Sequence, residues 1–542
     1  MKKYIKLGLI VLVSFTLVNC SDDKFFELER PQLFPWNNVG ELELSVVDSY
    51  AAFFLNQGWA APNGGLAYRD FVISDISVAS KHQPLEHEAV FYYERNFESA
   101  LVGGEEDGQF AQLYRCLNQI LPALTFIEEQ EAKGEEVFSG MTDNDRQTLA
   151  GQKGELYFMR AWVNYFLVRT FMPPFDPNGD NSAKFLPLKL SYEESQDGLR
   201  NADLGSVKDF YDLIISDLEK AKSLLPEQHS EPGRANKYVA STMLYRVGFL
   251  MGNHEAALAE CDFIIKEAVE AKGYYDLSED PIEVWDRNFG DAPAKESIWE
   301  VPLRAESENN DIPFARMTKI GYYRANGGGR GENWSQGWAG TMALSHNMLE
   351  KIGWMDPATK TPTPEALSDK RFNQVYYFLL AGKDKPEGLE GDAAIEADTL
   401  YDSQQRVTDN HIWVDKYYRA EEGRYSQLPL VRLAEIYLSR AMLRYSVNND
   451  VIGATADINT VRERAGLPTV ATVTEETIEA ERLKELAGEA GDRLLYLKGY
   501  QKSIDGNRID NGQAIPAIAP PYSNAYRPLP LGESDYNGNY NN

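Results

Sequence analysis

Apolar residues recur three and four positions apart along much of the chain, which is the spacing of amphipathic helices. The clearest run covers 145–172, where Leu149, Leu156, Met159 and Phe166 fall on one side and Pro173 follows. Similar patterns predict further helices, at 45–54, 109–133 and 206–225. Pro122 inside 109–133 predicts a kink or a break, because proline lacks the amide proton that a helix interior needs.

Two later stretches predict pairs of neighbouring helices. The first pair covers 234–251 and 254–272 and is joined by Gly252 and Asn253. Its small residues and its turn resemble those of a tetratricopeptide repeat, in which two antiparallel helices approach closely. The second pair covers 429–446 and 453–465.

Helical periodicity fades between about 273 and 428, where glycine, proline and aromatic residues become frequent. Long irregular stretches inside a compact domain are usually functional. No linker separates two domains, so we predict one body over 45–542. The expected fold class is mainly α, with a tetratricopeptide-like helical layer packed against a large irregular, loop-rich face.

The N-terminus predicts export. Lysines at 2, 3 and 6 precede an apolar run over 7–18, which is too short to span a bilayer and is typical of a signal peptide. The run ends Leu17-Val18-Asn19-Cys20, which resembles a bacterial lipobox. We therefore expect a cleaved signal peptide at 1–19, a lipid on Cys20 and a tether over 20–44. An incidental cysteine is the alternative.

Composition narrows the function. The chain has 54 Lys and Arg against 83 Asp and Glu, a formal net charge of −29. Nucleic-acid binding is disfavoured, since a phosphate binder needs a basic face. Adhesion to anionic lipid is disfavoured for the same reason. Cys116 and Cys261 lie among apolar neighbours and are predicted to be small core residues.

Catalytic motifs are incomplete. His254-Glu255-Ala256-Ala257 begins like a zinc-binding HExxH motif, but Leu258 stands where the second histidine belongs. The glycine run 327–331 lacks the Lys-Ser/Thr of a phosphate loop. The stretch 176–180 only echoes a calcium loop, and His82 with His87 is at most a weak metal pair. We therefore predict no catalytic residue, no metal site and no cofactor.

Three ordered segments near the C-terminus carry a family resemblance: 428–438 (LPLVRLAEIYL), 458–468 (INTVRERAGLP) and 478–486 (IEAERLKEL). The set is similar to that of the SusD/RagB family of outer-membrane nutrient-binding lipoproteins. Upstream segments at 154–161 and 296–301 also resemble the family. The run 487–493 departs from its usual pattern, which we interpret as a local packing change.

The resemblance implies a cell-surface lipoprotein of the outer membrane. Such a protein would bind an oligosaccharide, or in some relatives a peptide, and deliver it to a SusC-type TonB-dependent transporter without chemical change. A surface glycoside hydrolase that uses a carboxylate pair is one alternative. A non-catalytic adhesive or structural surface protein is the other.

Exposed aromatic side chains can cover the apolar face of a sugar ring, while polar groups address its hydroxyls. The resemblance places the ligand site in the N-terminal loop region and in the segment after 296–301. The predicted ligand-binding residues there are Trp59, Tyr68, Asp70, Tyr92, Tyr93, Asn96, Tyr322, Tyr323, Arg324, Trp334 and Trp338. Trp354 is a further aromatic of the second region. The alternative for each is core packing.

Other motif residues are predicted to be structural. Arg432, Glu435, Arg462 and Arg464 are expected to form buried arginine–carboxylate pairs that fix helix register. Trp162, Trp285 and Trp299 stand in packing positions, so we assign them to the core.

Overall fold

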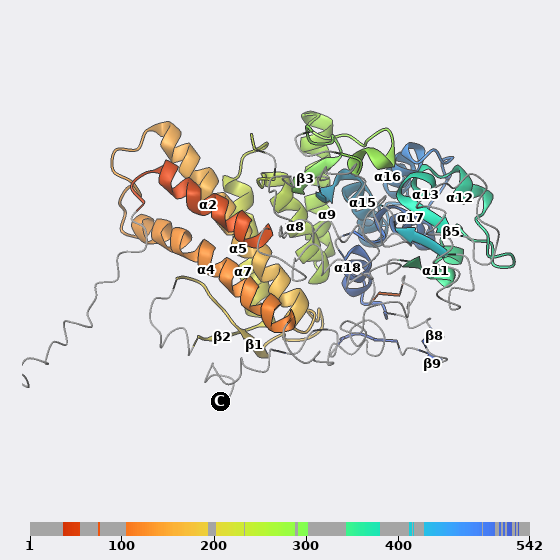
Figure 1. Ribbon diagram of the computed structural model, residues 1–542, viewed down its shortest axis with the longest axis horizontal. Coiled ribbons are helices and arrows are strands. Elements are labelled where there is room, and N and C mark those ends of the chain that lie inside the picture. Colours follow the sequence, from red (N-terminus) through yellow and green to blue (C-terminus); the bar gives the residue numbers. More distant parts are fainter. Residues whose placement is uncertain are drawn as a thin grey trace, which may run out of the picture.

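The computed structural model describes most of the helical part of the chain and shorter pieces elsewhere. The described residues are 36–54, 74–75, 105–192, 202–231, 233–287, 291–301, 343–379, 411–414, 416, 428–489, 491–504, 509–510, 513–514, 517–522, 526 and 529. The predicted mainly helical class is confirmed (Figure 1). Among these residues, no helix combines the length and hydropathy needed to cross a membrane.

A layer of long helices forms one side of the molecule (Figure 1). Its elements are α2 (Val39–Phe54), α4 (Glu105–Ala132), α5 (Asp143–Phe171), β1 (Lys184–Pro187), β2 (Leu204–Ser206) and α7 (Val207–Leu224). Helix α5 packs against α2, α4 and α7 and is buried along most of its length. Helix α4 continues through Pro122, so the expected break does not occur.

Capping side chains set where these helices begin. The hydroxyl of Thr142 accepts from the Asp145 amide, and the Asp145 carboxylate accepts in return from the Thr142 amide. Ser206 and Asp209 make the same reciprocal pair at the start of α7. Each pair satisfies amides that the first turn of a helix leaves without partners.

The helix layer continues into a second set of helices. These are α8 (Lys237–Leu250), α9 (His254–Phe263), η3 (Ile264–Ala271), α15 (Leu433–Asn448), α16 (Val451–Arg464), α17 (Glu475–Leu486) and α18 (Asp492–Gly499). Helices α8 and α9 pack together across the turn at Gly252, whose φ of +76° favours glycine. His254 is the first residue of α9 and its Nε2 lies 3.0 Å from the Gly499 carbonyl oxygen.

The described part of 273–428 holds more regular structure than its sequence indicates. It contains η4 (Pro281–Val284), β3 (Ser297–Val301), β4 (Ala343–Leu344), α11 (His346–Lys351), α12 (Pro364–Ser368), α13 (Lys370–Val375), β5 (Tyr376–Leu379) and β6 (His411–Val414). Strands β4, β6 and β5 form an antiparallel sheet in that order. A short hairpin of β8 (Ile509–Asp510) and β9 (Gln513–Ala514) lies near the C-terminus.

The predicted helix over 429–446 begins too early. Residues Leu428–Arg432 form β7, which pairs antiparallel with β3, and α15 starts only at Leu433. An apolar run of this length fits a buried strand as well as a helix, and pairing with the distant β3 decides between them.

The described residues form two apolar cores. The larger core runs through the long helices and includes Trp162, Trp299, Cys116 and Cys261, so their predicted burial is confirmed. The smaller core comprises Val284, Trp285, Leu344, Met348, Leu349, Ile352, Trp354, Met355, Ala366, Phe372, Val375, Tyr376, Val414, Leu483 and Ala487. Helix α17 contributes to both cores, with Ile478 and Leu486 to the larger and Leu483 to the smaller.

Candidate functional site

The predicted ligand-binding residues all fall outside the described part of the chain. They are Trp59, Tyr68, Asp70, Tyr92, Tyr93, Asn96, Tyr322, Tyr323, Arg324, Trp334 and Trp338, and Cys20 also lies outside it. What the structure does describe is the scaffold from which the segments bearing these residues depart.

Trp354 does not belong with the exposed aromatics. Its side chain is fully buried in the smaller core, where the ring centroids of Phe372 and Tyr376 lie 5.5 Å and 4.9 Å away. Trp354 is therefore a packing residue. Trp285, as expected, is buried in the same core.

The segment that carries Tyr322 to Trp338 is bounded by strands on both sides. It follows β3, which is hydrogen-bonded to β7, and it precedes β4, which is hydrogen-bonded to β6. Two regular sheets therefore fix the positions at which this segment leaves and re-enters the described structure.

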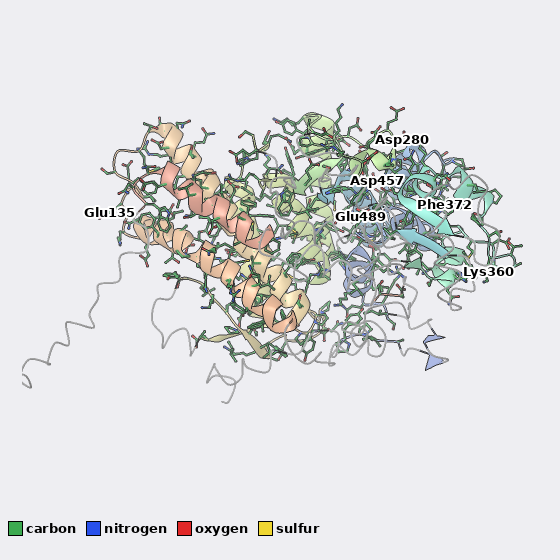
Figure 2. The ribbon with its side chains drawn as sticks, viewed as in Figure 1. Glu135, Asp280, Lys360, Phe372, Asp457 and Glu489 are labelled. Atoms are coloured by element: carbon green, nitrogen blue, oxygen red, sulfur yellow. The ribbon has the colours of Figure 1, made fainter. Side chains whose placement is uncertain are left out.

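A buried charge cluster lies where β3 begins and β7 ends, since Glu296 directly precedes β3 and Arg432 is the last residue of β7. We call Glu296, Lys416, Arg432, Glu485 and Glu489 the Arg432 cluster. The guanidinium of Arg432 donates to Glu296 at 2.5 Å, to Glu485 at 3.0 Å and to both oxygens of Glu489 at 2.8 Å. Lys416 Nζ donates to Glu489 at 2.6 Å and to the Glu485 carbonyl at 2.6 Å. Figure 2 shows Glu489 near the centre of the molecule, between the long helices and the part that contains Phe372.

Neighbouring arginines favour the charged form of Glu485 in this cluster. Burial alone would raise the pKa of Glu485, but Arg464, Arg432 and Arg371 together hold that pKa well below its usual range. Burial lowers the pKa of the Lys416 ammonium, and the charge of Glu489 opposes that effect. The predicted role of Arg432 and Arg464 in buried ion pairs is confirmed.

A second group of charges joins α13 to α16 and α17. Arg371 donates to Asp369 at 2.8 Å and to Glu481 at 2.8 Å, and Arg462 also pairs with Glu481. Burial would raise the pKa of Glu481, but Arg371, Lys484 and Arg462 lower it to about 2. Glu435 pairs with Arg246 of α8 at 2.6 Å, so each predicted motif residue takes part in a buried ion pair.

A third group brings the N-terminal region to the same part of the molecule; we call Asp75, Lys351, Glu479 and Arg493 the Arg493 junction. Arg493 donates from Nε and Nη2 to the two oxygens of Asp75, at 2.7 Å and 2.6 Å. Its Nη1 donates to Glu479 Oε1 at 2.7 Å, and the same oxygen accepts from Lys351 Nζ at 2.7 Å. Asp75 belongs to the predicted N-terminal loop region, whereas Lys351 ends α11, the helix that follows β4.

Hydrolysis by a carboxylate pair needs an acid that can reach the substrate. Burial raises the pKa values of four carboxyl groups within the described ranges, those of Asp217, Glu300, Asp457 and Asp492. Each is buried and paired with arginine, namely Arg160, Arg287, Arg440 and Arg482. These four carboxyl groups are paired in the interior, where a ligand cannot reach them.

The structure reveals buried ion pairs that sequence reasoning does not predict. Lys416, Glu489, Asp75 and Arg493 were not predicted, because their partners lie far away along the chain. The only indication in the sequence is that residues 487–493 depart from the usual family pattern, and this segment contains both Glu489 and Arg493. Within the described ranges, no group of three or more His, Cys, Asp or Glu side chains is placed to hold a metal ion.

Comparison with known families gives two matches to different parts of the chain. A family described as "SusD family" matches residues 295–542. A second, described as "Starch-binding associating with outer membrane", matches residues 77–249. The two matches together span most of the predicted body.

Individual relatives agree with these matches. The chain is 23% identical over 425 residues to SusD-like protein P2 of Formosa agariphila, and the alignment covers 74% of each protein. A SusD superfamily protein of Bacteroides thetaiotaomicron superposes with a TM-score of 0.67 at 19% identity, over 93% of this chain and 98% of the other. A SusD-like carbohydrate-binding protein of Bacteroides vulgatus gives a TM-score of 0.63 at 17% identity, over 93% and 97%.

Proposed function

Because the chain belongs to the SusD/RagB family, we propose that it binds an oligosaccharide at the outer membrane and passes it on without hydrolysis. The observation that carries this proposal is the pair of family matches, one of which is described as starch-binding and associated with the outer membrane. The similar protein from Bacteroides vulgatus is a SusD-like carbohydrate-binding protein.

We propose one ligand face built from the two predicted segments. In the sequence, Asp75 follows Asp70 by five residues, and His346, the first residue of α11, follows Trp338 by eight. Glu479 connects the two described positions, since it accepts from Arg493, the partner of Asp75, and from Lys351 of α11. This connection supports the proposal that the two segments act together.

Binding without hydrolysis fits the charges of the scaffold. The buried carboxyl groups with raised pKa values are paired with arginines, and Glu485 of the Arg432 cluster has a lowered pKa because three arginines surround it. A surface of Trp and Tyr rings with neighbouring polar groups would supply recognition instead. Trp334 and Trp338, in a glycine-rich context, are the residues that we propose as the main sugar platform.

The export signals complete the proposal. A lipid on Cys20 would anchor the protein in the outer membrane facing the cell exterior, with residues 20–44 as a tether. The partner that receives the ligand would be a SusC-type TonB-dependent transporter. Labelling with radioactive palmitate should mark the wild type and spare Cys20→Ser, and the transporter should co-purify with the wild-type protein.

A binding screen tests the ligand claim. The detergent-purified full-length protein is screened against oligosaccharides and peptides, beside the double variant Trp334→Ala/Trp338→Ala and the control Trp36→Ala. Trp36 is a half-buried tryptophan of the helix layer, outside both ligand-bearing regions. We expect an oligosaccharide to bind the wild type and the control, and at least tenfold weaker binding by the double variant.

Other outcomes would redirect or refute the proposal. Undiminished binding by the double variant would move the platform to Trp59, Tyr68, Tyr92 and Tyr93. Binding of peptides alone would refute the oligosaccharide claim, and cleavage of any ligand would refute transport without chemistry.

A further inference from the structure

The chain around Ser74 and Asp75 is fastened to the body of the protein far from α2 and α4, the helices that flank it in sequence. Ser74 is fully buried, and the Asp75 side chain is only 10% exposed. Its partner Arg493 is buried at the start of α18. A buried contact of this kind fixes a chain position more firmly than a surface ion pair does.

All three nitrogens of the Arg493 guanidinium are used. Two of them form parallel bonds to the Asp75 carboxylate, a geometry that matches the planar fork of arginine and that lysine cannot reproduce. The third binds Glu479, and the ring of Tyr496 packs 5.3 Å from the guanidinium carbon. The direction of the fork, and with it the position of Asp75, is therefore fixed from several sides.

The same guanidinium is connected to the other ligand-bearing region. Glu479 accepts from both Arg493 and Lys351 through one oxygen, at 2.7 Å in each case. Lys351 is the last residue of α11, which β4 precedes with one residue between them. Asp75 and α11 are thus both bonded to the same part of the molecule, Asp75 through Arg493 of α18 and α11 through Glu479 of α17. Some 270 residues separate them in the sequence.

We propose that Arg493 is a positioning residue for ligand binding, which holds the chain at Asp75 in register with α11. The ligand part of this inference rests on the proposed function. Loss of the Asp75 carboxylate should release the chain at this position and disturb the spacing between the two regions. Helix α5 should keep its packing, because the bonds of Arg493 of α18 run to Asp75 and to Glu479 of α17.

The test combines hydrogen exchange with ligand affinity in the detergent-purified full-length protein. In Asp75→Asn, we expect peptides that contain residue 75 to exchange at least tenfold faster, while peptides from α5 exchange as in the wild type. The dissociation constant for the oligosaccharide found in the screen should rise at least tenfold. Asp75→Glu, which keeps the carboxylate, should recover part of both losses.

Asp217→Asn is the matched control. Asp217 accepts a bidentate pair from Arg160, with both distances 2.7 Å, between α5 and α7. It should lower thermal stability and leave affinity unchanged. Equal loss of affinity in both variants, or unchanged exchange at residue 75 in Asp75→Asn, would overturn the inference. If the wild type binds no oligosaccharide, the proposed function fails, while the exchange result still supports or overturns the anchoring role of Arg493.

Discussion

The larger and the smaller core are held together by different means. In the larger core, long amphipathic helices bury aromatic and aliphatic side chains against one another, and buried pairs such as Arg160–Asp217 join neighbouring helices. The smaller core has fewer apolar residues and shares α17 with the larger one. Glu481, Lys484 and Glu485 of α17 are all buried, so the region where the two cores meet depends on a network of opposite charges.

This difference has a consequence for sensitivity to mutation. Removing one partner from a buried charge network leaves the remaining charges buried without an opposite charge. Shortening one apolar side chain removes only part of the total packing energy of a large core. The part of the molecule that bounds the predicted ligand segment should therefore be the part most easily disrupted by a single charge change.

Loss of Arg432 should have the largest effect. Arg432→Met leaves Glu296, Glu485 and Glu489 facing one another with fewer cations, so the free energy of unfolding should fall by about 3–5 kcal/mol. Hydrogen exchange should accelerate in α13 and α17 before α5. Lys208→Met is the control, since its exposed pair with Asp212 should leave the free energy of unfolding nearly unchanged. Equal losses in the two variants would show that the buried Arg432 cluster stabilises the fold no more than an exposed pair does.

Lowering the pH should have the second-largest effect on stability, because it protonates Glu481 in the charge network. The pKa of Glu481 is about 2 in the folded protein, below the ordinary value of 4.5. A lowered pKa gives stability that is present above the ordinary value and is lost as the pH falls from 4.5 towards 2. Thermal melts between pH 6 and pH 2 should show a flatter dependence in Glu481→Gln than in the wild type. Parallel pH profiles for the two proteins would show that Glu481 does not carry this dependence.

A change in the larger core should have the smallest effect. A Cβ on Gly154 of α5 would lie 3.0 Å from Leu224 Cβ and 3.2 Å from the Leu225 backbone nitrogen. Gly154→Ala gains about 1 kcal/mol of helix propensity but must push α7 outward, which typically costs about 1–3 kcal/mol. Urea unfolding should show a net loss of about 1 kcal/mol. A more stable variant would mean that the two helices have room to spare.

The elements also differ in how well the sequence predicts them. Helices α5 and α7 follow from apolar spacing and from caps at Thr142 and Ser206, all of which are local signals. Strand β7 was mistaken for the start of a helix, because its pairing with β3 involves residues more than a hundred positions away. Helix α17 is rich in Glu, Lys and Arg, yet eight of its residues are buried.

The candidate site divides in the same way. The motif residues Arg432, Glu435, Arg462 and Arg464 were correctly assigned to buried ion pairs, but their partners could not be named from spacing. The Asp75–Arg493 pair joins positions 418 residues apart, and no local sequence pattern predicts it. Trp354 shows that composition alone does not separate exposed from buried aromatic residues, since this tryptophan of an irregular stretch lies in the core.

The most direct test of the central claim is recovery of the bound oligosaccharide. The full-length protein is saturated with the tightest oligosaccharide from the screen, held for a day, denatured, and the sugar is weighed by mass spectrometry. We predict that the sugar is recovered at its original mass and amount. Shorter products in proportion to protein and time, absent without protein, would contradict the claim that the protein binds and delivers without chemistry.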